Sequence, residues 1–92
     1  MPILKIPTLM KSYVNNQVEV HLKGDTVAEV LIDLVTAYPQ IKVHIIDKNG
    51  DLRRYVNLFI NGVDIKDING IKTILQPDDK IILLPSISGG SQ

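Results

Sequence analysis

Alternation of apolar and polar residues marks the start of the chain as two strands. Residues 2–7 are rich in apolar side chains and are bounded by prolines, as is typical of a short strand. In residues 17–22, Val18, Val20 and Leu22 alternate with polar side chains, which is the pattern of a strand buried on one face. Residues 11–16 between them predict a turn, so the two strands are expected to pair as a hairpin.

Residues 26–39 follow the period of a helix. Apolar side chains recur there at spacings of three and four residues, at Val27, Val30, Leu31, Leu34 and Val35. Thr26, with Glu29 three residues later, fits a capping box at the start, and Pro39 ends the segment. We expect one apolar stripe of this helix to pack on a sheet.

The second half of the chain predicts further strands. Residues 40–54 have no clear period: the first part fits a helical turn or a strand, and the rest is a polar loop. Residues 55–60 predict a strand, and Asn61-Gly62 after it is the strongest short signal for a hairpin turn. A short strand, a brief helical segment and a turn are expected over 63–79, and residues 80–85 form the last strand.

This order of elements predicts a fold class. A hairpin, one main helix, a second hairpin and a final strand indicate an α+β fold, the ubiquitin-like β-grasp, in which a mixed sheet carries the helix on one face. Residues 1–85 would form this single domain. Residues 86–92 would form a flexible C-terminal tail that contains Gly89-Gly90.

Two of the predicted strands do not alternate. If every second residue of 80–85 faces the helix, Ile82 and Leu84 face away from it, and Phe59 does the same in 55–60. Either a loop covers this second face or the register differs, or Phe59, Ile82 and Leu84 form an exposed apolar patch that docks a partner beside the tail.

Composition narrows the function classes. Ten basic and ten acidic residues give a formal net charge of zero, which argues against general nucleic-acid binding. The chain has no cysteine, which excludes disulfides, thiolate metal sites and cysteine nucleophiles. No apolar stretch approaches the roughly 20 residues of a membrane span, so we expect a cytoplasmic protein without a membrane partner.

Residues that often carry catalysis are scattered. His21 and His44 stand alone and are expected to be surface or partly buried side chains. Asp78-Asp79 lie in a proline-containing turn, where Asp serves local hydrogen bonds, and Arg53-Arg54 would be solvated or would dock an acidic partner. No HExxH, P-loop or GxSxG motif is present. We therefore expect no catalytic residue, metal or cofactor, and a protein that is not an enzyme.

Three stretches together resemble the MoaD/ThiS family of sulfur carriers. They are GDTVAEVLIDL in the helix, RRYVNLFINGVDI in the central hairpin and DDKIILLPSISGG at the end. The resemblance covers nearly the whole chain, and within the family the length and pattern are most similar to the CysO-like branch, whose carriers serve cysteine synthesis.

The resemblance implies a chemistry and a set of partners. An ATP-dependent activating enzyme of the MoeB/ThiF type would adenylate the carboxylate of Gly90, and a sulfur donor would convert it to a thiocarboxylate. The sulfur would pass to a cysteine synthase in a CysO-like pathway, or to the large subunit of molybdopterin synthase in a MoaD-like one. Gly89 and Gly90 have no side chains, so this segment can enter a narrow channel.

Two residues depart from the family pattern. Carriers of this family end at Gly-Gly, whereas here Ser91 and Gln92 follow, so Gly90 has an amide where the chemistry needs a carboxylate. A JAMM-type metalloprotease would remove them; alternatively this is an inactive form, or Ser91-Gln92 is a cloning remnant. Three functions stay open: a sulfur carrier, a ubiquitin-like modifier joined through Gly90 to lysines, and a β-grasp interaction module without C-terminal chemistry.

Overall fold

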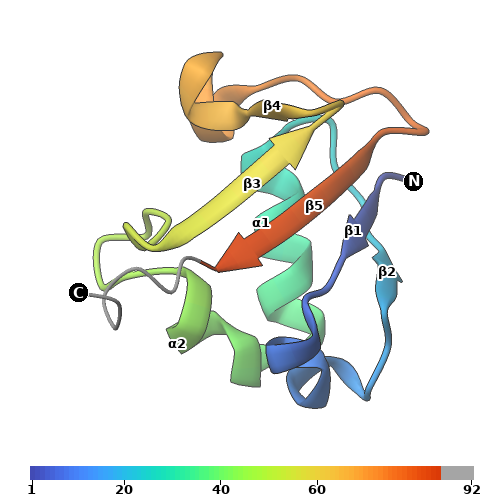
Figure 1. Ribbon diagram of the computed structural model, residues 1–92, viewed down its shortest axis with the longest axis vertical. Helices are drawn as coiled ribbons and strands as arrows, with labels where there is room; N and C mark the ends of the chain where they lie inside the picture. Colours follow the sequence, from blue (N-terminus) through green and yellow to red (C-terminus); the bar gives the residue numbers. More distant parts are fainter. Residues whose placement is uncertain (86–92) are drawn as a thin grey trace.

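A mixed five-stranded sheet forms the centre of the molecule (Figure 1). The computed structural model describes residues 1–85. The strands are β1 (Ile3–Lys5), β2 (Glu19–His21), β3 (Val56–Ile60), β4 (Val63–Asp64) and β5 (Lys80–Pro85), in the order β2-β1-β5-β3-β4. The last strand is thus the central one, parallel to β1 and antiparallel to β3.

The main helix, α1 (Val27–Ala37), begins and ends where the sequence predicted. The Thr26 hydroxyl accepts a hydrogen bond from the backbone N–H of Glu29 at 3.2 Å. The Glu29 carboxylate in turn accepts one from the backbone N–H of Asp25 at 2.9 Å, one residue before the usual capping-box donor. The predicted apolar stripe is confirmed: Val27, Val30, Leu31 and Leu34 are buried, and Val35 is partly buried against the core.

The Asn61-Gly62 turn is also confirmed. Ile60 of β3 pairs with Val63 of β4 in an antiparallel hairpin. Asn61 and Gly62 have φ angles of 54° and 81°, both in the left-handed region that a type I′ turn requires.

The connection between β1 and β2 differs from the prediction. The two strands pair antiparallel as expected, with Leu4 opposite Val20. A 3₁₀ helix, Thr8–Val14, joins them, however, so the turn predicted at 11–16 is wrong except at its end. The 3₁₀ helix forms because Met10 and Val14 reach the core from it.

The first part of residues 40–54, which the sequence left open between a helical turn and a strand, is helical. A 3₁₀ turn, Pro39–Ile41, runs into a short helix, α2 (Lys42–Ile45), and both bury an isoleucine. After β4, where one brief helical segment was expected, the chain forms two 3₁₀ turns, Ile65–Asp67 and Gly70–Lys72.

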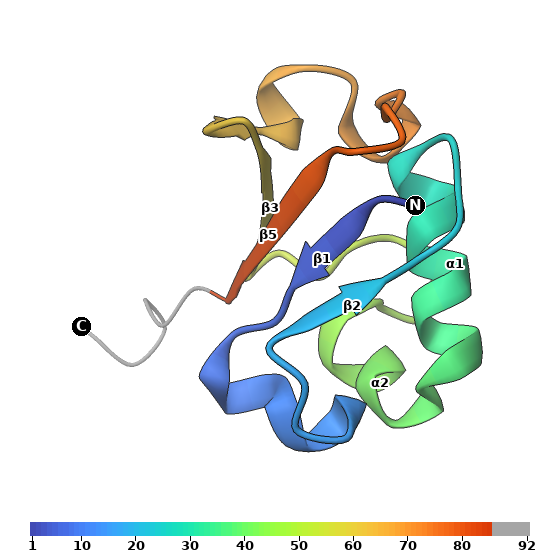
Figure 2. The same cartoon turned by 90° about the vertical axis from the view of Figure 1, so that its right-hand side faces the viewer.

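The core lies between α1 and one face of the sheet. Both α1 and α2 lie on this side of the sheet (Figure 2). Every strand except β4 contributes a buried apolar side chain: Leu4, Val20, Val56, Leu58, Ile60, Ile81 and Leu83. A mixed sheet that grips one main helix in this way is the ubiquitin-like β-grasp fold, as predicted.

Helix length bears on membrane insertion. The longest helix of the described residues, α1, has 11 residues, far short of the roughly 20 that cross a bilayer. Within residues 1–85, none of the helices is long and apolar enough to cross a membrane.

Candidate docking surface

Strand pairing brings Phe59, Ile82 and Leu84 together on the sheet face that points away from α1. Phe59 of β3 lies directly opposite Ile82 of β5. Leu84 follows Ile82 by two residues on the same strand and therefore points to the same side. We call these three residues the outer patch, and the face that carries them the outer face.

The outer patch is accessible. Leu84 is 47% exposed, and Phe59 and Ile82 are partly buried. Their strand neighbours Leu58, Ile81 and Leu83 are fully buried, which confirms the predicted register and excludes the register alternative. Neither α1 nor α2 covers the outer face, because both lie on the other side of the sheet (Figure 2).

Polar groups surround the outer patch. Lys5 of β1 lies opposite Ile82 on the side away from Phe59. Asn57 lies opposite Leu84, and its side-chain oxygen accepts a hydrogen bond from the Lys66 ammonium at 3.0 Å. An apolar centre with a charged rim is the usual anatomy of a protein-binding surface.

The sequence did not identify the rim. Lys5 and Lys66 lie far from residues 80–85 along the chain, and only the parallel pairing of β1 with β5 and the turn after β4 bring them close. The alternation of residues 2–7 places Lys5 outward, but its neighbour across the sheet could not be predicted without the strand order.

The other predicted site residues belong to the tail. Gly89, Gly90, Ser91 and Gln92 lie outside the described residues. β5 leads to this tail, and the last described residue of the strand, Pro85, pairs with Val56 of β3. The outer patch therefore ends next to the point where the tail leaves the sheet.

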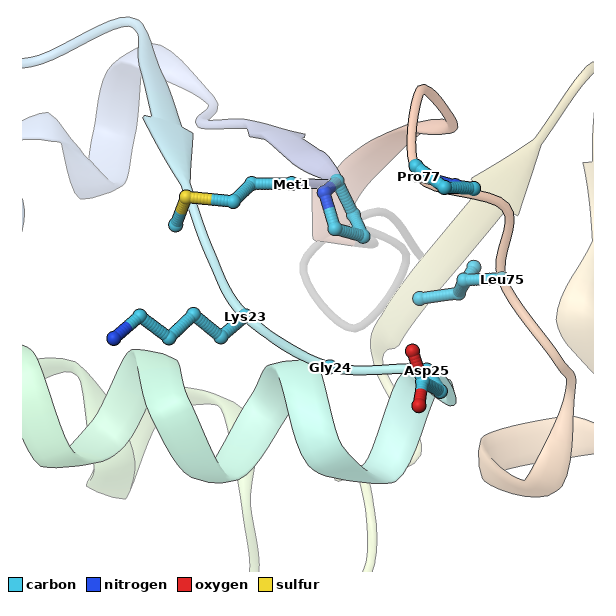
Figure 3. A pocket seen from close by; sticks show the side chains of 7 residues that line it. Met1, Lys23, Gly24, Asp25, Leu75 and Pro77 are labelled. Carbon is cyan, nitrogen blue, oxygen red and sulfur yellow. The ribbon is translucent and has the colours of Figure 1, made fainter.

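A cavity of about 220 Å³ lies at the opposite end of the sheet, where β5 begins (Figure 3). Met1, Lys23, Asp25 and Pro77 are among the residues that line it. Only one carboxylate and one lysine side chain line this cavity, and it lies remote from the tail exit.

The residues considered for catalysis do not converge. His21 is exposed on β2, whereas the ring of His44 stacks on Tyr13 with 4.2 Å between ring centroids. The Asp79 carboxylate accepts a hydrogen bond from the backbone N–H of Gln76 at 2.8 Å, the local role expected of this turn. In the part of the chain that the structure describes, no group of three potential metal ligands comes together.

Comparison with known sequences identifies the family of this chain. The sequence model of the ThiS family matches residues 4–90. The sulfur carrier protein CysO of Mycobacterium tuberculosis is 32% identical over 89 residues, which are 95% of this chain and 96% of that protein.

Two solved structures superpose on nearly the whole of this chain. The BexX/CysO complex of Amycolatopsis orientalis contains a chain that superposes with a TM-score of 0.88 at 26% identity, covering 98% of this chain and 100% of that one. The small archaeal modifier protein 1 of Methanosarcina acetivorans superposes with a TM-score of 0.86 at 30% identity, covering 97% and 95%. On the family match and the shared fold, this chain belongs to the ThiS family.

Proposed function

We propose that this protein is a sulfur carrier, whose Gly90 carboxylate is adenylated and then converted to a thiocarboxylate. The observation that carries the proposal is the reach of the family match, which extends through Gly89 and Gly90. A relative of nearly equal length that is named a sulfur carrier supports it. That relative's name also supports the expectation that the chain is a carrier on which partner enzymes act.

The chemistry needs only a free carboxylate on Gly90. Its oxygen attacks the α-phosphorus of ATP, pyrophosphate leaves, and an acyl adenylate forms. A sulfide donor then attacks the acyl carbon and AMP leaves, so sulfur replaces one carboxylate oxygen. The thiocarboxylate is ionised at neutral pH, which makes its sulfur a good nucleophile, as a thiolate is.

The outer patch is the proposed docking site for the ATP-dependent activating enzyme, of the MoeB/ThiF type. Leu84 is only one residue from Pro85, after which the tail begins, so an enzyme that contacts Leu84 can hold the tail in its active site. A partner that covers Phe59, Ile82 and Leu84 buries apolar surface that the folded domain leaves in water. Because activation consumes ATP, we place the protein in the cytoplasm.

The proposed acceptor of the sulfur is an activated serine. In the CysO-like reading, a cysteine synthase joins the thiocarboxylate to O-phosphoserine. In the MoaD-like alternative, the large subunit of molybdopterin synthase delivers the sulfur to a pterin precursor. The thiocarboxylated protein incubated with each enzyme and its substrate distinguishes the two pathways, because only the true acceptor consumes the sulfur.

Ser91-Gln92 requires a processing step in this proposal. Gly90 is followed by Ser91, so its carbonyl is part of a peptide bond. We propose that a JAMM-type metalloprotease cleaves this bond. Mass spectrometry of the protein from the cells that make it should find a chain ending at Gly90, and finding only chains that retain Ser91 would count against the step.

A ubiquitin-like modifier is the second candidate, favoured by the structural similarity to a small archaeal modifier protein. Its activation is the same, but a lysine amine captures the acyl group instead of sulfide. An immunoblot of cell extract separates the two, because conjugates larger than the free protein form only with the modifier.

The direct test of the carrier chemistry uses a chain truncated after Gly90. We expect a mass gain of about 16 Da, the replacement of oxygen by sulfur, when this chain is incubated with the activating enzyme of its own organism, ATP and sulfide. If the mass gain is absent while the same enzyme preparation still activates a carrier already established as its substrate, the proposal is rejected.

A further inference from the structure

A groove on the α2 side of the sheet has a composition unlike that of the outer patch. It has a volume of about 360 Å³, and it is lined by Lys42, Val43, Ile46, Asp47, Lys48 and Arg53. Val43, which lines the groove, is 63% exposed and so offers apolar surface to a ligand.

Arg53 is fixed in this groove. Its backbone N–H donates to the Ile45 carbonyl at 2.9 Å, and its side-chain Nε donates to the Val43 carbonyl at 2.8 Å. The two terminal NH₂ groups of the guanidinium form no hydrogen bond or salt bridge with another residue of 1–85, so they remain available to a ligand. A guanidinium held in one orientation loses little conformational entropy when it binds a carboxylate.

The groove has an excess of positive charge. Three cations line it, and none of them forms a salt bridge with any residue from 1 to 85. The single carboxylate, Asp47, accepts hydrogen bonds from the backbone N–H groups of Asn49 and Asp51, which hold the loop, and its one negative charge offsets only part of the three positive charges. In a chain of zero net charge, this basic cluster is a local asymmetry.

The groove lies close to the tail exit. The Arg53 carbonyl accepts a hydrogen bond from the Val56 N–H at 3.0 Å, and Val56 pairs with Pro85 at the end of β5. The outer patch faces one side of the sheet at this point, and α2 lies on the other (Figure 2). An enzyme that encloses the tail therefore meets both surfaces.

We infer that the groove binds an acidic segment of the activating enzyme, with carboxylates on Lys42, Lys48 and Arg53 and an apolar side chain on Val43. The inference rests on the proposed function, because that function supplies the enzyme. Charge complementarity identifies the occupant, because three cations that form no salt bridge within residues 1–85, beside the exposed Val43 side chain, attract a segment that carries both carboxylates and an apolar side chain. The outer patch then provides apolar contact, and the groove provides steering and orientation.

The test measures pyrophosphate release by the activating enzyme, with chains that end at Gly90. The variant Lys42→Glu/Lys48→Glu reverses two exposed charges and leaves Arg53, which holds α2, in place. The control Lys23→Glu/Lys72→Glu makes the same charge change at exposed positions remote from the tail exit. Thermal unfolding of the unsubstituted chain and both variants checks that the fold is equally stable in each.

We expect the groove variant to raise the KM for the carrier by about tenfold or more at low salt, with kcat unchanged. The difference in KM between the groove variant and the control should become smaller as salt screens the charges. A KM equal to that of the control, or a difference independent of salt, overturns the inference while the proposed function stands. If the unsubstituted chain releases no pyrophosphate, the proposed function fails instead, and the inference fails with it.

Nucleic acid is the competing occupant of a basic groove. Fluorescence anisotropy with a single-stranded oligouridine probe measures it on the same three chains. Probe binding that the groove variant abolishes, together with an unchanged KM in the enzyme assay, would assign the groove to RNA and overturn the inference.

Discussion

The two faces of β3 and β5 carry similar residues in opposite surroundings. On the inner face, Leu58, Ile81 and Leu83 are almost completely buried beneath α1. On the outer face of the same strands, Phe59 and Ile82 are partly buried, and Leu84 is half exposed. Strand geometry separates them, because successive side chains point to opposite sides of a sheet.

This difference separates stability from binding. Inner side chains already have their partners within the domain, so their apolar area contributes to folding. Phe59, Ile82 and Leu84 on the outer face keep part of their surface in contact with water in the isolated domain, and that part can contribute only when another molecule covers it. Variants at adjacent residues should therefore have separate effects, on unfolding for one face and on docking for the other.

The largest expected effect compares two neighbouring leucines. Leu83→Ala should lower the free energy of unfolding by about 2–5 kcal/mol, because it leaves a cavity in the core. Leu84→Ala should lower it by about 1 kcal/mol or less, because about half of this side chain stays in water. Denaturant unfolding of both variants measures the difference, and equal losses would show that Leu84 belongs to the core.

The second effect is on docking. Leu84→Glu, in a chain ending at Gly90, should lower kcat/KM for the activating enzyme by about tenfold or more, because central apolar anchors dominate interfaces. Phe59→Ala and a charge at Ile82 should act in the same direction. The matched control is Ile32→Glu, which puts the same charge at a 63% exposed position on α1. If the control is as slow as Leu84→Glu, the outer face is not the docking surface.

The third effect is on the helix that covers the inner face. Thr26→Ala removes the hydroxyl that accepts from the Glu29 N–H, and it should cost about 1 kcal/mol of unfolding free energy. Chemical denaturation measures the loss, and Thr26→Ser should recover most of it because serine also caps well. Docking to the activating enzyme should not change, and a parallel loss of docking would mean that the two faces are coupled.

The smallest expected effect is the change in unfolding free energy when the ion pair between Lys80 and Glu19 on the outer face is removed. The Lys80 ammonium lies 3.1 Å from the Glu19 carboxylate, but both side chains are well exposed. Lys80→Gln should therefore change the unfolding free energy by less than about 0.5 kcal/mol. A thermal unfolding series in increasing salt tests this, and a loss above about 1 kcal/mol would give the outer face a structural role that its exposure does not suggest.

Much of the fold was predictable because local signals agreed with it. Asn61-Gly62 can adopt two successive left-handed residues, and Thr26 with Glu29 marks a helix start whatever the helix packs against. The register of β3 and β5 stayed open at the level of sequence, because both strands carry apolar side chains on both faces. The burial of Leu83 against the exposure of Leu84 shows that the alternative with Leu84 on the outer face is the right one.

The rest depended on contacts between distant segments. Thr8–Val14 has no side-chain cap at its start and a 3₁₀ rather than an α-helical period, so only the core contacts of Met10 and Val14 reveal it. The basic groove requires α2 and Arg53 to meet, and the hydrogen bond from Arg53 to Val43 spans ten residues. The sequence pattern predicted the outer patch, but its charged rim requires the strand order.

The most direct test of the account follows the mass of three chains incubated with the activating enzyme, ATP and sulfide. They are the chain ending at Gly90, the same chain with Leu84→Glu, and the chain that keeps Ser91 and Gln92. We expect a gain of about 16 Da that is rapid for the first, slow for the second and absent for the third. No gain on the first chain, or an equal gain on the third, would contradict the claim that a free Gly90 carboxylate receives the sulfur.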